Sequence, residues 1–251
     1  MNRNECTVTR YLKIVRAGLA EYNYLGGFHY RQSAGCAHTA IYAMTDTHPV
    51  RSRFCPVVGV IVYMMPTAHV ELRNIATGGM FCGFGDRRLQ LQMVNKYIRR
   101  IARVIIEPRY RGLGLAGRLV AETMPQIGVP IIEAMSVMGV VHPFFERAGM
   151  KRYEAKPSAG SIRLIEALGM VGIDEAEFID PQSIQDKLEG LGGSEVAFIE
   201  RQMNDFLQGY GKRRRMPPGI ERTRYILSKL TARPLYYIWF NNDLELCPPG
   251  C

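Results

Sequence analysis

The chain has 251 residues, of which 47% are hydrophobic and 22% are charged, and its formal net charge is +9. Such a chain can bury a core as one large domain or as one domain with an extension, and its charge favours anionic partners. No run of about 18 apolar residues is present to span a bilayer, and the start of the chain lacks the apolar core of a signal peptide, so a cytoplasmic protein is expected.

The N-terminal part predicts a helix followed by an aromatic segment. Apolar residues at Val8, Leu12, Val15 and Leu19 recur at helical spacing, which predicts a helix over residues 8–20. Tyrosines, a phenylalanine and a histidine then gather around a pair of glycines that would stop a helix.

Two strands are predicted over residues 37–44 and 57–65, with turn-forming residues between them. The second strand is a nearly continuous apolar run. Residues 68–77 predict a further short strand, and residues 89–100 have the composition of a helix. This helix leads directly into the most informative stretch of the chain.

That stretch reads as a strand, a glycine-rich turn and a helix. Residues 101–106 are apolar and mostly β-branched apart from Arg103, and Pro108 ends the strand because it has no N–H to donate. Gly112 and Gly114 permit positive φ and a close approach of a ligand to the main chain. The free N–H groups at the start of the following helix would form an anion site suited to a pyrophosphate.

Other glycine-loop motifs fit this turn less well. A Walker loop requires Lys-Ser or Lys-Thr after the glycines, and neither is present. The spacing Gly112-x-Gly114-x-x-Gly117 matches the dinucleotide-binding pattern, but Arg111 precedes the first glycine and no βαβ repeat follows. A strand, turn and helix without any ligand is the remaining alternative.

The pattern Arg111-x-x-Gly114-x-Ala116, after an apolar strand and Pro108, resembles the acetyl-CoA pyrophosphate loop of the GNAT N-acetyltransferase superfamily. The resemblance implies an α/β (α+β) fold with a mixed, mostly antiparallel central sheet flanked by helices. It also implies acetyl-CoA, or another acyl-CoA, as co-substrate. The residues that it assigns to CoA binding are Val104, Ile105, Ile106, Arg109, Arg111, Gly112, Leu113, Gly114, Leu115 and Ala116.

The segment after the loop departs from this family. Residues 129–135 predict a strand, and residues 142–150 resemble a short helix and turn in which many members carry a tyrosine that protonates the departing CoA thiolate. Phe145 stands at that position and has no proton to give. His142 and Tyr153 are the alternative acids that the sequence offers.

The last third of the chain predicts helices and one strand. Residues 161–211 show three apolar stripes at helical spacing, residues 219–230 predict one more helix, and residues 234–240 predict a strand. Because a GNAT sheet ends in a hairpin of its last two strands, the resemblance implies that residues 234–240 pair beside residues 150–155.

The helices would then form an insertion before the last strand. The expected parts are an acyl-CoA-binding core over residues 1–155, a basic helical insertion over residues 156–233, and a closing strand with a tail over residues 234–251. A separate C-terminal helical bundle is the alternative.

Within the superfamily, the loop and the segment His142 to Met150 look most like the GNAT-like domain fused to ABC-type ATPases, and that group is similar to the phage Mom proteins, which modify adenine in DNA. The resemblance brings an ABC-type ATPase and DNA into consideration as partners, although no ATPase motif exists in this chain. The basic cluster of Lys212, Arg213, Arg214 and Arg215 is the candidate nucleic-acid-binding site.

Three functions therefore remain open: an acyl-CoA-dependent N-acyltransferase, a Mom-like DNA adenine modification enzyme, and a non-catalytic CoA or nucleic-acid binding module. An attacking amine must lose a proton, and Glu71 and Glu133 are the candidate bases; with His142 as a candidate acid, they are the candidate catalytic residues. The aromatic segment supplies the candidate acceptor-binding residues, which are Tyr22, Tyr24, His29 and Tyr30.

The six cysteines do not suggest a metal site. They are scattered, with no Cys-x-x-Cys pair and no neighbouring Cys/His cluster. We expect reduced thiols and no bound metal.

Overall fold

The computed structural model describes residues 7–28, 37–139, 141–231 and 234–245. The chain divides into two compact units. Unit 1 consists of residues 1–154 together with residues 234–251, and unit 2 consists of residues 155–233. Each unit has its own apolar core.

Unit 1 is built on a seven-stranded sheet in the order β1-β2-β3-β4-β5-β7-β6. Neighbouring strands are antiparallel except β4 and β5, which are parallel. The strands are β1 (Leu12–Ala17), β2 (Ala40–Asp46), β3 (Val57–Met64), β4 (Ile98–Ile106), β5 (Ile131–Ser136), β6 (Lys151–Tyr153) and β7 (Leu235–Phe240). The expected mixed, mostly antiparallel sheet is confirmed.

Helices cover both faces of this sheet. α4 (Leu115–Thr123) and α5 (Phe144–Arg147) pack on one face. The opposite face is covered by α1 (Leu19–Gly26), α2 (Glu71–Ala76) and α3 (Arg87–Tyr97). Because the middle of the sheet is buried on both sides, β2 and β3 are almost continuously apolar rather than alternating.

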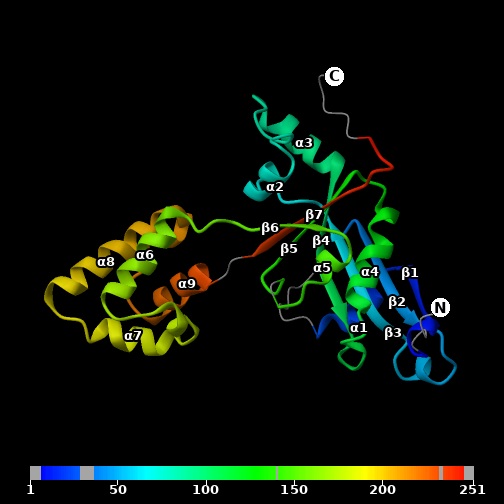
Figure 1. Ribbon diagram of the computed structural model, residues 1–251, viewed down its shortest axis with the longest axis horizontal. Helices are drawn as coiled ribbons and strands as arrows, with labels where there is room; N and C mark the ends of the chain where they lie inside the picture. Colours follow the sequence, from blue (N-terminus) through cyan, green and yellow to red (C-terminus); the bar gives the residue numbers. More distant parts are fainter. Residues whose placement is uncertain (1–6, 29–36, 140, 232–233, 246–251) are drawn as a thin grey trace. The chain divides into compact units, whose positions relative to one another are not determined.

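The closing strand β7 lies between β5 and β6. Tyr237 is opposite Ala134 on one side and Arg152 on the other, so β7 is hydrogen-bonded to strands that precede it by about a hundred and about eighty residues. Figure 1 shows the orange-red β7 beside the green β5. The expectation that residues 234–240 pair beside residues 150–155 is confirmed, and helices precede this strand in the chain.

Two sequence-based expectations are wrong. Residues 8–20 do not form one helix: a short η1 (Thr9–Tyr11) is followed by β1, and α1 starts only at Leu19. Of the apolar stripe, only Leu12 is buried, because hydrogen bonding of β1 to β2 overrides the helical periodicity. Residues 68–77 hold the helix α2 and not a strand.

Unit 2 is helical. Its helices are α6 (Ala159–Met170), α7 (Pro181–Glu189), α8 (Gly193–Leu207) and α9 (Ile220–Thr231), with 3-10 segments η5 (Glu175–Ile179) and η6 (Gln208–Arg215). Its core is formed by Leu, Ile, Phe and Met side chains from all four helices. In the described ranges no helix has the length and apolar character needed to cross a membrane. The remaining 3-10 turns, all in unit 1, are η2 (Arg51–Arg53), η3 (Pro108–Tyr110) and η4 (Pro125–Ile127).

Candidate functional site

The parallel strands β4 and β5 separate part of the way along their length. In these two fully described strands, the ladder joins only Ile98–Ile101 to Ile131–Ala134, although β4 continues to Ile106. The separation coincides with a β-bulge: Val62 pairs with Arg103 and Tyr63 with Ile101, so that Ala102 is an extra residue in β4. The carboxyl-terminal half of β4 is therefore paired with β3 alone.

The glycine-rich loop follows directly at the end of β4. Gly112 has φ 83° and Gly114 has φ 74°, and a Cβ built on either residue would meet no atom within 4 Å. Both glycines are therefore needed for their left-handed backbone and not to avoid a clash. The main chain of this loop lies exposed at the surface.

Gly114 is also the N-cap of α4 and supplies no side-chain cap. The first hydrogen bond of the helix runs from the Arg118 N–H to the Gly114 carbonyl at 3.2 Å. Helix geometry consequently leaves the N–H groups of Leu115, Ala116 and Gly117 without acceptors from the preceding turn, at the positive end of the helix dipole. Such a group of main-chain donors is suited to binding an anion.

Two arginines stabilise the turn that leads from β4 into this loop. The Glu107 carboxylate accepts a hydrogen bond from Arg109 Nε at 2.6 Å and another from the Arg109 main-chain N–H at 2.8 Å. Arg111 Nε donates to the carbonyl oxygen of Ile106, the last residue of β4, at 3.1 Å. These bonds fix the turn between the strand and Gly112.

The expected CoA-contacting residues of the strand lie on both faces of the sheet. Val104 and Ile106 belong to the α4 side of the core, and Ile105 belongs to the α1 side. Two surface hollows flank Leu113, and their volumes are about 570 and 480 Å³. The first is lined by Val8, Arg51, Phe54, Cys55, Arg109, Tyr110 and Leu113, and the second by Thr9, Arg10, Leu113, Leu115, Arg118 and Glu122.

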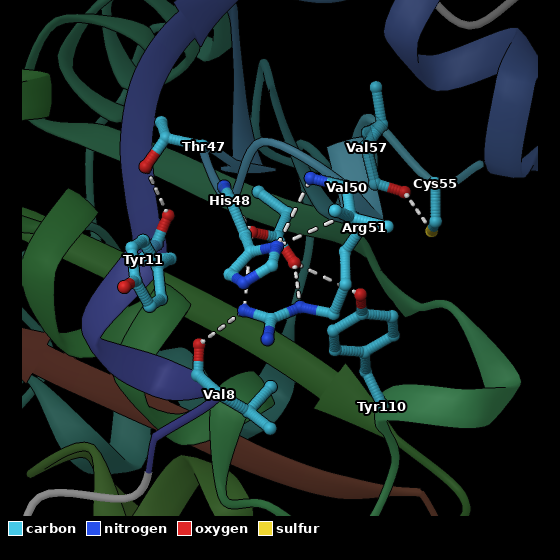
Figure 2. A network of polar contacts seen from close by, with 10 residues as sticks. Val8, Tyr11, Thr47, His48, Val50, Arg51, Cys55, Val57 and Tyr110 are labelled. Atoms are coloured by element: carbon cyan, nitrogen blue, oxygen red, sulfur yellow. Dashed lines mark hydrogen bonds and ion pairs between the residues drawn. The ribbon is translucent and has the colours of Figure 1, made fainter. Parts of the chain in front are cut away.

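The first hollow is bordered by a polar network around the buried Asp46. Its carboxylate accepts hydrogen bonds from Arg51 Nε at 2.7 Å, from the His48 N–H at 2.8 Å and from the Tyr110 hydroxyl at 3.1 Å. Figure 2 shows the Arg51 guanidinium turned toward Val8, whose carbonyl oxygen accepts a hydrogen bond from it. Burial alone would raise the pKa of Asp46, but these hydrogen bonds outweigh it and hold the pKa below its usual value.

The network ties the β2–β3 turn to the glycine loop. Arg51 belongs to η2 in that turn, and Tyr110 is the last residue of η3 just before Arg111. Burial and the Glu107 charge raise the pKa of the nearby Cys55 thiol, so this cysteine stays protonated and unreactive.

The position at which the resemblance implies a tyrosine lies on α5. Phe145 is buried there and packs against Tyr237 with ring centroids 4.9 Å apart. α4 approaches this helix closely, because a Cβ on Gly117 would lie 3.4 Å from the Phe144 carbonyl oxygen. Of the two alternative acids, His142 is exposed and Tyr153 is half-buried on β6.

The two candidate glutamates differ in environment. Glu71 is exposed in the first turn of α2. Glu133 is buried and forms an ion pair with Arg73 of α2, and it also accepts a hydrogen bond from the Tyr236 hydroxyl at 2.9 Å. It points to the α2 side of the sheet, together with Ile131, so the geometry favours a structural role for Glu133.

Of the candidate acceptor-binding residues, the structure describes Tyr22 and Tyr24, both on α1. Tyr22 of α1 is buried among apolar residues of β2, β3 and β4, whereas Tyr24 is about half exposed. His29 and Tyr30 lie outside the described residues. Packing of α1 on the sheet therefore accounts for Tyr22.

Lys212, Arg213, Arg214 and Arg215 form an exposed run in η6 of unit 2. Arg213 stacks over the Tyr225 ring at 5.4 Å. Unit 2 as a whole is nearly neutral, with 12 Lys or Arg and 11 Asp or Glu, whereas the rest of the chain has 20 and 12. The positive excess of the protein therefore lies in unit 1, and the basic run is a local feature.

Three features of the site were not identified from the sequence: the Asp46 network, the Arg73 partner of Glu133, and Tyr237. Each depends on strands or helices that come from distant parts of the chain. Tyr110 and Asp46 are 64 residues apart in the sequence, and Arg73 and Glu133 are 60 residues apart. For Tyr237 the only local sign was the aromatic content of its strand.

No family model matches the chain, and no curated protein matches it. Among solved structures, Arabidopsis thaliana NAA60 in complex with acetyl-CoA is 11% identical over 57% of this chain and 88% of that chain, with a TM-score of 0.41. The N-acetylglutamate synthase from Neisseria gonorrhoeae, complexed with coenzyme A and N-acetyl-glutamate, is 14% identical over 58% of this chain and 29% of that chain, with a TM-score of 0.35. A mutant agmatine N-acetyltransferase in its apo form is 12% identical over 57% of this chain and 84% of that chain, with a TM-score of 0.34.

Proposed function

We propose that this chain is an acyl-CoA-dependent N-acyltransferase of the GNAT type. The observation that carries the proposal is the combination of a parallel strand pair that separates after four residue pairs with a glycine loop and an uncapped helix at the end of the same strand. The loop supplies donors for a pyrophosphate, and the half of β4 that is not paired with β5 supplies an edge for an extended amide-containing chain. Acyl-CoA contains a pyrophosphate that is followed by such an amide-containing chain.

The charge distribution supports an anionic co-substrate. Unit 1 has eight more basic than acidic residues, and three of its arginines, Arg109, Arg111 and Arg118, lie in the loop or in the first turn of α4. Arg109 and Arg118 are each paired with a glutamate. The main-chain N–H groups therefore remain the principal direct donors, and the net charge supplies a long-range attraction.

The reaction follows from placing two reactants side by side. A neutral amine attacks the thioester carbonyl carbon, the C–N bond forms, the C–S bond breaks, and the amine proton leaves to solvent or to a base. Holding amine and thioester in one cleft supplies effective molarity without a covalent intermediate. Of the two candidate bases, Glu71 is exposed to solvent and Glu133 is buried.

Binding of acetyl-CoA to two matched variants tests the proposal. Gly114→Glu adds a negative charge where the pyrophosphate would lie, and it should remove measurable binding in isothermal titration calorimetry. Gly128→Glu is the control: Gly128 has φ 70°, a Cβ there would also meet nothing within 4 Å, and it lies beyond the other end of α4. Equal CoA affinity in the two folded variants would refute the proposed site.

A second candidate function is contact with a polyanion such as DNA, which the Mom-like alternative requires. The supporting observation is the exposed run Lys212–Arg215, for which no ion pair is found in the described part of the chain. Phosphate contacts by these side chains would release counterions and make binding strongly salt-dependent. The near-neutral charge of unit 2 limits this attraction to the run itself.

A further inference from the structure

The Tyr237 side chain on β7 presents a buried hydroxyl that has no hydrogen-bond partner within the described residues. The residue is 0% exposed, and its ring packs in the core of unit 1. Buried polar groups are nearly always paired, because an unsatisfied one is costly. Tyr237 therefore calls for an explanation other than packing.

The position of Tyr237 relates it to the separation of β4 from β5. It lies directly opposite Ala134, and Ala134 is the last residue of β5 that pairs with β4, through Ile101. Directly opposite residues share a face of the sheet, and Ile101, Ala134 and Tyr237 belong to one core cluster beneath α4 and α5. Tyr237 is thus on the α4 face of the sheet and at the level where the pairing of β4 with β5 ends.

The hydroxyl points toward the end of β5. A Cβ built on Gly139, three residues after the last residue of β5, would collide with the Tyr237 hydroxyl. Because β4 and β5 are parallel, this end of β5 is on the same edge of the sheet as the glycine loop. Gly139 leaves room for the hydroxyl at that edge.

Tyr237 also contacts the residue that stands at the family's acid position. The rings of Phe145 and Tyr237 lie 4.9 Å apart between centroids, with an interplanar angle of 36°. We propose that the Tyr237 hydroxyl, and not residue 145, donates the proton to the departing thiolate in the acyl transfer proposed above. The inference rests on that proposed function.

Two charged residues act on the phenol from neighbouring elements. Burial raises the pKa of Tyr237, the Glu146 carboxylate of α5 raises it further, and Arg152 of β6 opposes them. The phenol is consequently protonated at neutral pH. One carboxylate oxygen of Glu146 is also buried without a hydrogen-bond partner among the described residues.

The transfer step balances as follows. The amine nitrogen bonds to the thioester carbonyl carbon, and the tetrahedral adduct collapses with cleavage of the C–S bond, whose electron pair stays on sulfur. The Tyr237 O–H gives its proton to that sulfur, which yields free CoA thiol. The proton shed by the amine returns through solvent to the phenolate, so one amide and one thiol form from one amine and one thioester.

Tyr237→Phe tests the proposal, because it deletes only the hydroxyl. Removing an unpaired buried hydroxyl should leave the denaturation midpoint unchanged or higher. We expect CoA affinity within about twofold of wild type and turnover lowered by about a hundredfold, the usual size of a general-acid contribution. Turnover is measured as CoA release with a panel of amines.

Leaving-group dependence separates a proton donor from a structural residue. Two truncated donors are compared, the acetyl thioester of N-acetylcysteamine and an acetyl aryl thioester, whose thiolate needs no proton to depart. The deficit of Tyr237→Phe should persist with the first donor and nearly disappear with the second. In the Tyr237→Phe background, Phe145→Tyr should restore part of the rate, since it places a phenol on the adjacent ring.

A conservative variant covers the case in which Tyr237→Phe does not fold. Incorporation of 3-fluorotyrosine at position 237 keeps the hydroxyl and lowers its pKa, so the loss of turnover at alkaline pH should begin at a lower pH. An unmoved alkaline limb overturns the proposal.

The remaining outcomes are distinct. A Tyr237→Phe deficit that is equal for both thioesters, or turnover within about threefold of wild type, overturns the role of Tyr237 and leaves acyl transfer standing. A wild-type protein that binds no CoA and forms no amide overturns the proposed function itself.

Discussion

Arg73 and Glu133 form a two-point ion pair inside unit 1, in which Arg73 Nε and Nη2 donate to the two carboxylate oxygens at 2.8 and 2.7 Å. Each side chain is only 1% exposed. The remaining donors of Arg73 reach the carbonyl oxygens of Thr67 and Ala68. The pair therefore fastens α2 and the segment before it to the centre of the sheet.

Glu133→Gln should destabilise the fold strongly, because it leaves a buried guanidinium without its counter-charge. Breaking such a pair costs about 3–5 kcal/mol, whereas replacing both partners by apolar residues is often neutral. Urea denaturation should show this loss in Glu133→Gln and its recovery in Arg73→Met/Glu133→Leu. Glu71→Gln, at an exposed position, is the control. A stable but inactive Glu133→Gln protein would instead support catalysis by Glu133.

The Asp46 carboxylate should contribute to acid sensitivity. Its pKa is lowered in the folded protein, so its stabilising effect is present above the unfolded value of about 3.9 and is lost as pH falls below it toward the folded pKa. Asp46→Asn should reduce the free energy of unfolding at pH 7 by about 1.5–3 kcal/mol. The difference between the two proteins should shrink below about pH 4. Unfolding of both proteins is followed by circular dichroism at fixed ionic strength. A difference in the free energy of unfolding that stays constant over about pH 2–7 would contradict this prediction.

Replacement of Lys212, Arg213, Arg214 and Arg215 by serine should flatten the salt dependence of any DNA binding, since each lost phosphate contact reduces the slope of log K against log salt by about 0.9. Binding of acetyl-CoA should be unchanged. The measurement is fluorescence anisotropy of labelled duplex DNA over a salt series. A wild-type protein without salt-dependent binding would leave the run as a solvated surface segment.

Unit 1 should fold without unit 2. Tyr153 and Tyr236 are opposite each other on β6 and β7, so a short hairpin loop can join the strands directly. A chain in which residues 155–233 are replaced by a glycine-containing turn should unfold cooperatively and bind acetyl-CoA as the full chain does. A molten or aggregated product would show that the units depend on each other for stability.

Phe145→Tyr alone should leave CoA release within about threefold of wild type, because Tyr237 already supplies the proton. Phe145→Leu provides a matched control for the packing of this buried position. If only the tyrosine variant releases CoA, the wild type is a binding module and the proposed function is wrong.

Sequence patterns predicted the parts of the fold that local chemistry determines. β3 and α4 begin at the residues that the apolar runs indicated, and Gly114 has the left-handed backbone that the loop required. β1 was missed because an edge strand with lysine and arginine among its apolar residues has a period that also fits a helix. Pairing with β2, which is distant in sequence, decides between the two structures.

The candidate site could be predicted only where one segment forms it. The loop from Arg111 to Ala116 is continuous, so its left-handed glycines and the start of the following helix could be predicted from the sequence. The environment of Glu133 depends on Arg73, sixty residues away, and that of Phe145 depends on β7. Such pairings are set by the topology of the sheet and leave no periodic signal in either segment.

The place of β7 between β5 and β6 also constrains how the protein is made. During synthesis, β5 and β6 leave the ribosome long before residues 235–240 do. Each of these strands therefore has an unpaired edge while unit 2 is being synthesised. Exposed edges of this kind recruit other chains. If unit 2 folds during that interval, it shortens the effective loop that β7 must close. Unit 2 would then act during synthesis as a folding aid for the sheet, whatever it binds in the finished protein.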